Sequence, residues 1–282
     1  MNFARFAAID WSGAKGKRHK GIAIAMAEAG EAAPRLVRPE HVWSRTEVLD
    51  WLLAEAAAAP TLFGFDCSFA PPIAERGEYL PGEPEVPTDA KSFWAYVDAL
   101  SDDEDLGAAS FLERAHRRHF YFGAADGRKR DFLHHRACEH AFNATGGGKA
   151  STLYDAIGAA QVAKASFAGM RLLHHLAGRV PVWPMDPAPE AGSVVVEIYT
   201  RAFIRMAGLS GRKVRSRAEL NAALAALGSR PVRLRREPSD HETDVLIAAA
   251  GMRAIAGDDT WWRPPGLTPA LARSEGWTFG VV

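Results

Sequence analysis

The stretch from Phe6 to Lys17, FAAIDWSGAKGK, places a carboxylate at the end of an apolar run. The run predicts a buried β-strand, and Ser12 and Gly13 predict a turn, so Asp10 is expected near the C-terminal end of the strand. A charge in such a place is costly unless a cation or hydrogen bonds compensate it. An aspartate that only caps the next turn is the alternative for Asp10 taken alone. The choice depends on whether other segments supply partners.

Two more apolar runs carry one acid each. Thr61 to Phe69, TLFGFDCSF, predicts a buried strand that ends in an acid, Asp66. Ser193 to Tyr199, SVVVEIY, predicts another buried strand, which contains Glu197. Three predicted strands therefore carry embedded acids.

A helix with polar groups in its first turns is expected near the C-terminus. The capping-box pattern Ser239-Asp-His-Glu242 predicts its start, and apolar spacing continues to about Ala256. Asp240 and Asp244 lie on one face of this helix, and His241 is adjacent.

The other expected elements complete an α/β pattern. Short connections predict that the strand containing Asp10 begins an antiparallel meander of three strands. The ranges are Lys20–Ala29 and Arg35–Trp43 for strands, and Thr46–Ala59, Ser151–Ala177 and Arg217–Leu227 for helices.

The stretch 73–149 differs from its surroundings, since it is rich in proline, then acidic, then aromatic and basic. It predicts a long insertion with short helices of its own, after the fourth strand of a single domain that spans 1–282.

Right-handed crossovers place the fourth strand beside the first and the fifth beside the fourth. The prediction is a mixed five-stranded sheet in the order 3-2-1-4-5, flanked by helices. Neighbouring strands lie about 4.8 Å apart, so Asp10 and Asp66 at matching heights could share one metal ion. Several acids at one sheet edge repel one another unless cations lie between them.

Composition bounds the class of protein. The chain has 282 residues, of which 48% are hydrophobic, enough for a sizeable core. It has no apolar stretch of membrane-spanning length and no signal-peptide pattern at the N-terminus, so we expect a cytoplasmic protein without a membrane partner. The two cysteines, Cys67 and Cys138, lack CxxC spacing and argue against a disulfide scaffold or a zinc site.

The net charge is zero, but the charges are segregated along the chain. Ten acids and two bases lie between Glu75 and Asp105, whereas ten bases and one acid lie between Arg201 and Arg236. Such segregation suits a local contact with nucleic acid or phosphate, and ordinary solvated faces are the alternative.

The motifs AAIDWSG, FGFDCSFAPP, VVVEIYT and DHETDVLIAAA, in this order, resemble the RNase H-like fold. Across nearly the full chain the sequence is similar to the predicted RNase H-fold nucleases filed as family 429 of the domains of unknown function. His241-Glu-Thr-Asp244 is also similar to the His-x-x-Asp that starts the final helix of Holliday-junction resolvase-type nucleases. The fourth strand carries Asp66 where the resolvases have Glu, and Glu197 is an addition.

The resemblance implies a nuclease that depends on Mg²⁺ or Mn²⁺ and acts on DNA or RNA. Asp10 would bridge two ions, Asp66 and Asp244 would each hold one side, and Glu197 would assist. Asp240 is a further candidate ligand. His241 would orient or deprotonate the attacking water, or is an ordinary surface histidine. Candidate nucleic-acid contacts are Lys15, Lys17, Arg18, Lys20, Arg212, Lys213 and Arg215.

Two other functions stay open. One is a catalytically inactive RNase H-like binding module. The other is a relative of the actin-like and sugar-kinase ATPases, although the sequence shows no second Asp-Gly phosphate loop.

Overall fold

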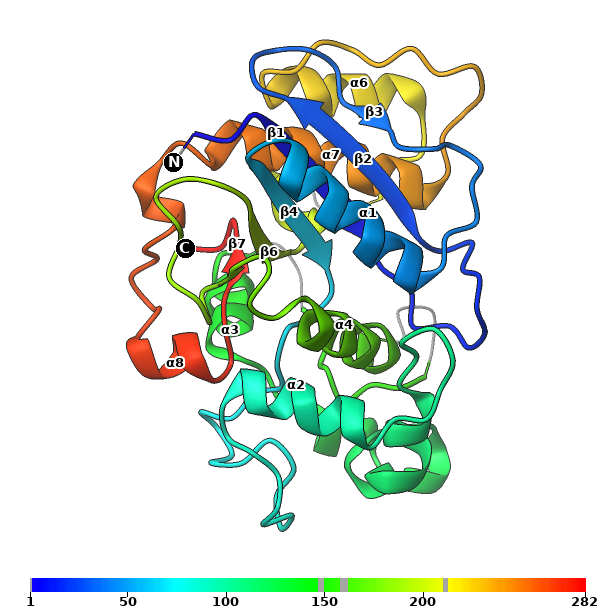
Figure 1. The fold of residues 1–282 in the computed structure, drawn as a ribbon, viewed down its shortest axis with the longest axis vertical. Coiled ribbons are helices and arrows are strands. Elements are labelled where there is room, and N and C mark those ends of the chain that lie inside the picture. The colour runs from blue at the N-terminus through cyan, green and yellow to red at the C-terminus, as the bar shows by residue number, and fades with distance from the viewer. Residues whose placement is uncertain (1, 147–149, 158–161, 210–212) are drawn as a thin grey trace.

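The computed structural model describes residues 2–146, 150–157, 162–209 and 213–282. Within these ranges seven strands form one mixed sheet in the order β3-β2-β1-β4-β6-β5, and β7 also pairs with β6. β1 is antiparallel to β2 and parallel to β4 (Figure 1). The strands are β1 (Arg5–Asp10), β2 (Ala23–Glu28), β3 (Arg35–Leu36), β4 (Thr61–Asp66), β5 (Val182–Trp183), β6 (Val194–Ile198) and β7 (Thr278–Phe279).

The observed order differs from the predicted order 3-2-1-4-5 because β5 and β7 join the sheet along β6. Each of these strands has only two residues, which is too short for an alternating pattern. The predicted α/β class with a mixed sheet is confirmed.

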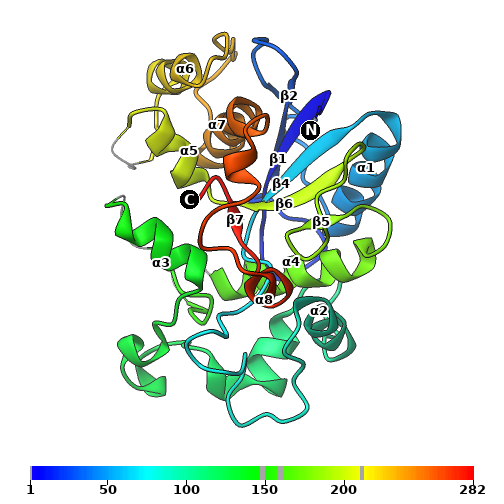
Figure 2. The same cartoon turned by 90° about the vertical axis from the view of Figure 1, so that its left-hand side faces the viewer.

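Helices cover both faces of the sheet. Successive strand residues point to opposite faces, so Ile9 and Phe65 join the core under one set of helices, and Ala8 and Leu62 join the core under the other. Figure 2 shows α1 on one side of the sheet and α5, α6 and α7 on the other. The helices are α1 (Arg45–Ala58), α2 (Ala90–Ala99), α3 (Ala137–Ala144), α4 (Val162–Leu176), α5 (Thr200–Met206), α6 (Arg217–Ala226), α7 (Asp240–Ile255) and α8 (Pro269–Arg273).

The position of α7 across the sheet depends on a glycine of β4. A Cβ at Gly64 would lie 2.5 Å from the sulfur of Met252 in α7 and 2.8 Å from Cγ2 of Ile198, so a larger residue would displace these side chains or α7. Helix α7 packs on β1, β2 and β4 and thereby carries its N-terminal residues toward the ends of these strands.

Stretch 73–149 follows β4 and holds α2, α3 and several single-turn segments. Helix α2 lies in the lower half of Figure 1, where it packs on α4. Two of the single-turn segments adjoin each other: η1 (Phe111–Ala115), a π-helical turn, and η2 (Arg117–His119).

Two predicted elements are shorter than expected. The strand predicted over Arg35–Trp43 ends at Leu36, since Arg38 and Glu40 have positive φ values that no strand accommodates. The helix predicted over Ser151–Ala177 does not include residues 151–157, which are not helical, and α4 is described over Val162–Leu176. The helices predicted to start at Thr46, Arg217 and the Ser239 capping box are confirmed as α1, α6 and α7.

The C-terminal tryptophans are part of the core and not merely a cover over it. Trp262 and Trp277 are buried in the core on the α7 side of the sheet, and Trp261 packs against that core. None of the helices in the described ranges has both the length and the apolar character needed to cross a membrane.

Candidate functional site

Asp10 and Asp66 are the last residues of two adjacent parallel strands. They are direct partners in the register of β1 and β4, and alternation places both on the face covered by α7. The apolar residues before them hold the strands in the core, while the chain turns away directly after each acid. The sequence pattern of an apolar run that ends in an acid therefore sets two carboxylates side by side.

Helix α7 adds a histidine to this pair. Ser239 and Glu242 form the predicted capping box, which fixes the start of the helix. His241 in the first turn lies with its Nδ1 2.5 Å from Oδ2 of Asp10. This hydrogen bond raises the pKa of His241 above its ordinary value, although partial burial opposes the shift.

Asp66 is the most strongly perturbed carboxyl of the group. Burial, and then the negative charge of Asp10, raise its pKa to about 8. The hydroxyl of Thr200, the first residue of α5, donates a 2.8 Å hydrogen bond to Oδ2 of Asp66 and opposes the shift. At neutral pH this carboxyl is therefore largely protonated in the metal-free protein.

Asp244 lies one turn after Asp240 in α7. Burial and the charge of Asp10 raise its pKa to about 6, and the ammonium of Lys213 counteracts them. The charge of Asp244 also contributes to the raised pKa of Asp66. The three aspartates thus share one electrostatic neighbourhood in which each added negative charge is unfavourable.

The aspartates are nevertheless spaced more widely than a tight ligand set. In the described part of the chain, the one group of three or more acids, histidines or cysteines whose ligand atoms all lie within 4.8 Å of one another is Glu83, His116 and His119. This group could hold a metal ion. Asp10, Asp66 and Asp244 would have to draw together by side-chain rotation to share ions.

Glu197 does not belong with the aspartates, contrary to the prediction. It pairs with Phe65 in the register of β4 and β6, so alternation points it to the opposite face from Asp66. There both its oxygens bind the buried guanidinium of Arg136, and one accepts a 2.8 Å hydrogen bond from the backbone N–H of Phe69. The hydroxyl of Thr278 donates another bond of 2.7 Å. Glu197 is committed to a buried structural ion pair.

Asp240 is half-exposed and is bound by Lys213, whose Nζ lies 2.7 Å from its Oδ2. This hydrogen bond lowers the pKa of Asp240. The surface ion pair leaves Asp240 at the edge of the site, where it repels Asp244 and attracts Lys213.

Most of the predicted nucleic-acid contacts have acidic partners. Three lie in the turn after β1 and form exposed ion pairs with other segments: Lys15 with Glu113, Lys17 with Glu104, and Arg18 with Glu47. Exposed pairs of this kind are weak and can exchange their partner. The positive charge of Arg215 helps to lower the pKa of Asp240. Arg212 lies outside the described residues.

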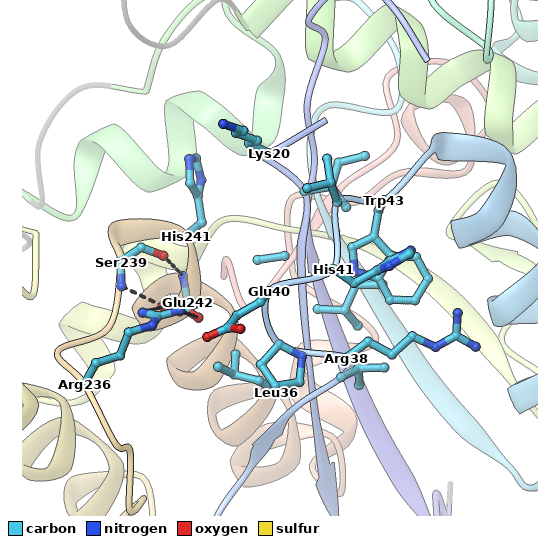
Figure 3. A pocket seen from close by; sticks show the side chains of 16 residues that line it. Lys20, Leu36, Arg38, Glu40, His41, Trp43, Arg236, Ser239, His241 and Glu242 are labelled. Carbon is cyan, nitrogen blue, oxygen red and sulfur yellow. Dashed lines mark hydrogen bonds and ion pairs between the residues drawn. The ribbon is translucent and has the colours of Figure 1, made fainter. Parts of the chain in front are cut away.

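A pocket with a volume of about 280 Å³ adjoins the aspartates through His241. It lies between the chain around β2 and β3 and the start of α7. Figure 3 shows that Lys20 and His241 border it, with Arg236 held against Glu242 by two bonds of 2.7 Å. The pocket and the aspartates therefore share His241 as a common border.

The sequence patterns did not predict that Glu83 forms a group with His116 and His119. The spacing His116-Arg-Arg-His119 is a visible signal, since two histidines a few residues apart can bind the same metal ion. Glu83 comes from the acidic part of the same stretch and has no motif of its own. Burial lowers the pKa of both histidines.

Comparison of the chain with protein families, with curated proteins and with solved structures gives no match.

Proposed function

We propose that the protein is a divalent-metal-dependent nuclease with an RNase H-like fold, which hydrolyses phosphodiester bonds of DNA or RNA. One observation carries this proposal: β1, β4 and α7 each bring an aspartate to one region, where burial and then the charge of Asp10 raise the pKa of Asp66 and Asp244. The mixed sheet, with an antiparallel β1–β3 meander, a parallel β4 and a helix packed across β1, supports the fold assignment.

The residues present fit a hard divalent cation. Carboxylate oxygens suit Mg²⁺ and Mn²⁺, and carboxyls that repel one another gain most from a positive ion. Asp10 would be the shared ligand because its charge acts on both Asp66 and Asp244. Bound ions would supply a metal-activated water and stabilise the charge on the leaving oxygen.

His241 contributes a proton at a defined place. Its Nδ1 faces Oδ2 of Asp10. Because its pKa is raised, the ring stays protonated up to a higher pH than the ring of an ordinary histidine does. A protonated ring fixes the rotamer of Asp10 and can donate a proton to a leaving oxygen. His241 is half-exposed and is among the residues that line the pocket, so a phosphate group could reach it.

Cations near the aspartates would bind the substrate backbone. Lys20 borders the pocket, and Lys213 lies close enough to Asp10 and Asp244 for their charges to raise its pKa. Phosphate oxygens can replace Asp240 as the partner of Lys213, because that ion pair is exposed. Binding should therefore weaken steeply with salt.

The test is a cleavage assay on single-stranded, duplex and branched DNA and RNA with Mg²⁺ or Mn²⁺. Asp10→Asn and Asp244→Asn should each lower the rate by about a thousandfold or more, since a ligand of the reacting centre is lost. Asp50→Asn is the matched control, because Asp50 is an exposed aspartate of α1. Cleavage that survives both site substitutions would refute the assignment.

The wide spacing of the aspartates favours a second candidate, an RNase H-like module that binds nucleic acid without cleaving it. Such a module would bind the same substrates with the same salt dependence but release no product under any metal. The cleavage panel, run beside a binding assay, separates the two functions.

A further inference from the structure

Three side chains of the stretch 73–149 converge far from the aspartates in sequence. Glu83 lies before α2, His116 directly follows η1, and His119 is the last residue of η2. Their ligand atoms all lie within 4.8 Å of one another. Both histidines are buried, with 5% and 9% of their surface exposed.

His116 carries a buried nitrogen without a partner. Its Nε2 lies 3.0 Å from the hydroxyl of Tyr96, which fixes the orientation of the ring. Its Nδ1 makes no hydrogen bond and faces Oε1 of Glu83 at 3.7 Å, which is beyond hydrogen-bond distance. A buried polar atom left in this state is costly, and a cation between the two atoms would satisfy both.

His119 approaches the same carboxylate. Its Nε2 lies 3.1 Å from Oε1 of Glu83, so both imidazoles face one oxygen. Two imidazoles and one carboxylate are a donor set for Zn²⁺ and other first-row transition ions, whereas Mg²⁺ and Ca²⁺ favour oxygen alone. The rings of Phe111 and Tyr96 pack against His116 and surround the group with apolar surface.

In the structure the guanidinium of Arg118 supplies the positive charge next to Glu83. Its Nε donates to Oε1 of Glu83 at 3.0 Å and to Nε2 of His119 at 3.3 Å. The Arg118 side chain is 63% exposed, so it can swing into solvent at little cost. A metal ion and Arg118 would therefore compete for the same two atoms.

We propose that Glu83, His116 and His119 form a binding site for a divalent transition ion of the Zn²⁺ class, with Arg118 as its displaceable competitor. The ion joins the turn before α2 to η1 and η2, and so fixes the fold of the stretch 73–149. Glu113 of η1 also binds Lys15 in the turn after β1, so the ion stiffens a segment that supports the loop following Asp10. The site is independent of nuclease activity.

Zinc binding to the full chain, stripped with a chelator and titrated against a chromophoric competitor, tests the proposal. The wild type should bind Zn²⁺ at this site, and His116→Asn and His119→Asn should each weaken that binding by at least about tenfold. Arg118→Gln should strengthen it, because the competing cation is removed. Saturating Zn²⁺ should raise the unfolding midpoint of the wild type by roughly 5 °C.

His140→Asn is the matched control, since His140 is a histidine of the same stretch that binds a different glutamate, Glu75. This substitution should leave the affinity of the Glu83 site unchanged, and so should Asp10→Asn. Zinc affinity that is the same in wild type, His116→Asn and His119→Asn would overturn the proposal. The proposal would also be overturned if an Arg118→Gln variant, folded as judged by circular dichroism, had a zinc affinity no higher than that of the wild type.

Discussion

Replacing Asp66 by Asn should stabilise the metal-free protein, and the gain should depend on pH. The folded-state pKa of Asp66 is about 8, against an ordinary value of 3.8. The folded state therefore binds more protons than the unfolded state between these values, and the stability of the wild type falls as pH rises through this window. Asn has nearly the same shape, can still accept the hydrogen bond from Thr200, and carries no charge.

The size of the effect follows from the shift. At pH 7 the carboxyl is about 3 pH units above its unfolded pKa yet still mostly protonated in the folded state, which corresponds to about 4 kcal/mol. The stability difference between Asp66→Asn and wild type should grow from near zero at pH 4 to about this value at pH 7. It should level off above pH 8, where Asp66 is ionised in both states.

Urea unfolding followed by tryptophan fluorescence, in EDTA and at each pH unit from 4 to 8, measures this difference. Asp50→Asn, an exposed aspartate, should show no such trend. Two results would contradict this prediction: an Asp66→Asn variant that is less stable than wild type at pH 7, or a difference in unfolding free energy that is the same at every pH. Either result would mean that the ionised carboxylate of Asp66 does not destabilise the folded protein.

Other expected outcomes concern the neighbours of Asp66. Asp10→Asn should lower the pKa of His241 in an NMR titration, because the hydrogen bond to Asp10 is the main cause of its raised value; an unchanged pKa would contradict the contact. Glu197→Gln should destabilise the protein by about 3 kcal/mol in urea unfolding, since it removes the carboxylate that binds two nitrogens of the buried Arg136 guanidinium and leaves Glu139 as its charged partner, while Mn²⁺ affinity should not change. Loss of Mn²⁺ binding in this variant would indicate that Glu197 contributes to the metal site after all. Raising the salt concentration should weaken nucleic-acid binding with a linear log–log slope, and a flat dependence would argue against phosphate contacts by Lys20 and Lys213.

The sequence reveals those parts of the fold that depend on local signals. The capping residues Ser44 and Ser239 mark the starts of α1 and α7, because their side chains bind backbone groups only three residues away. The apolar runs that end at Asp10 and Asp66 likewise predict strands. In the structure these are β1 and β4, and Asp10 and Asp66 are partners in their register. Each of these signals is contained within a few residues.

The parts that escape prediction depend on distant partners. Glu197 has the same sequence pattern as Asp66, yet its role is set by Arg136, which lies 61 residues away. The strand face decides between the two acids, and that face follows from register, which the sequence alone does not fix. Glu83 meets His119 across 36 residues, through turns that have no periodic pattern.

The proposed function requires Asp10, Asp66 and Asp244 to bind divalent metal together. A crystal structure of the protein soaked in Mn²⁺, with anomalous difference maps, tests it most directly. We expect at least one peak coordinated by Asp10 together with Asp66 or Asp244, and its loss in Asp10→Asn crystals. Crystals soaked at saturating Mn²⁺ that show no peak at Asp10, or a peak only at Glu83, His116 and His119, would contradict it.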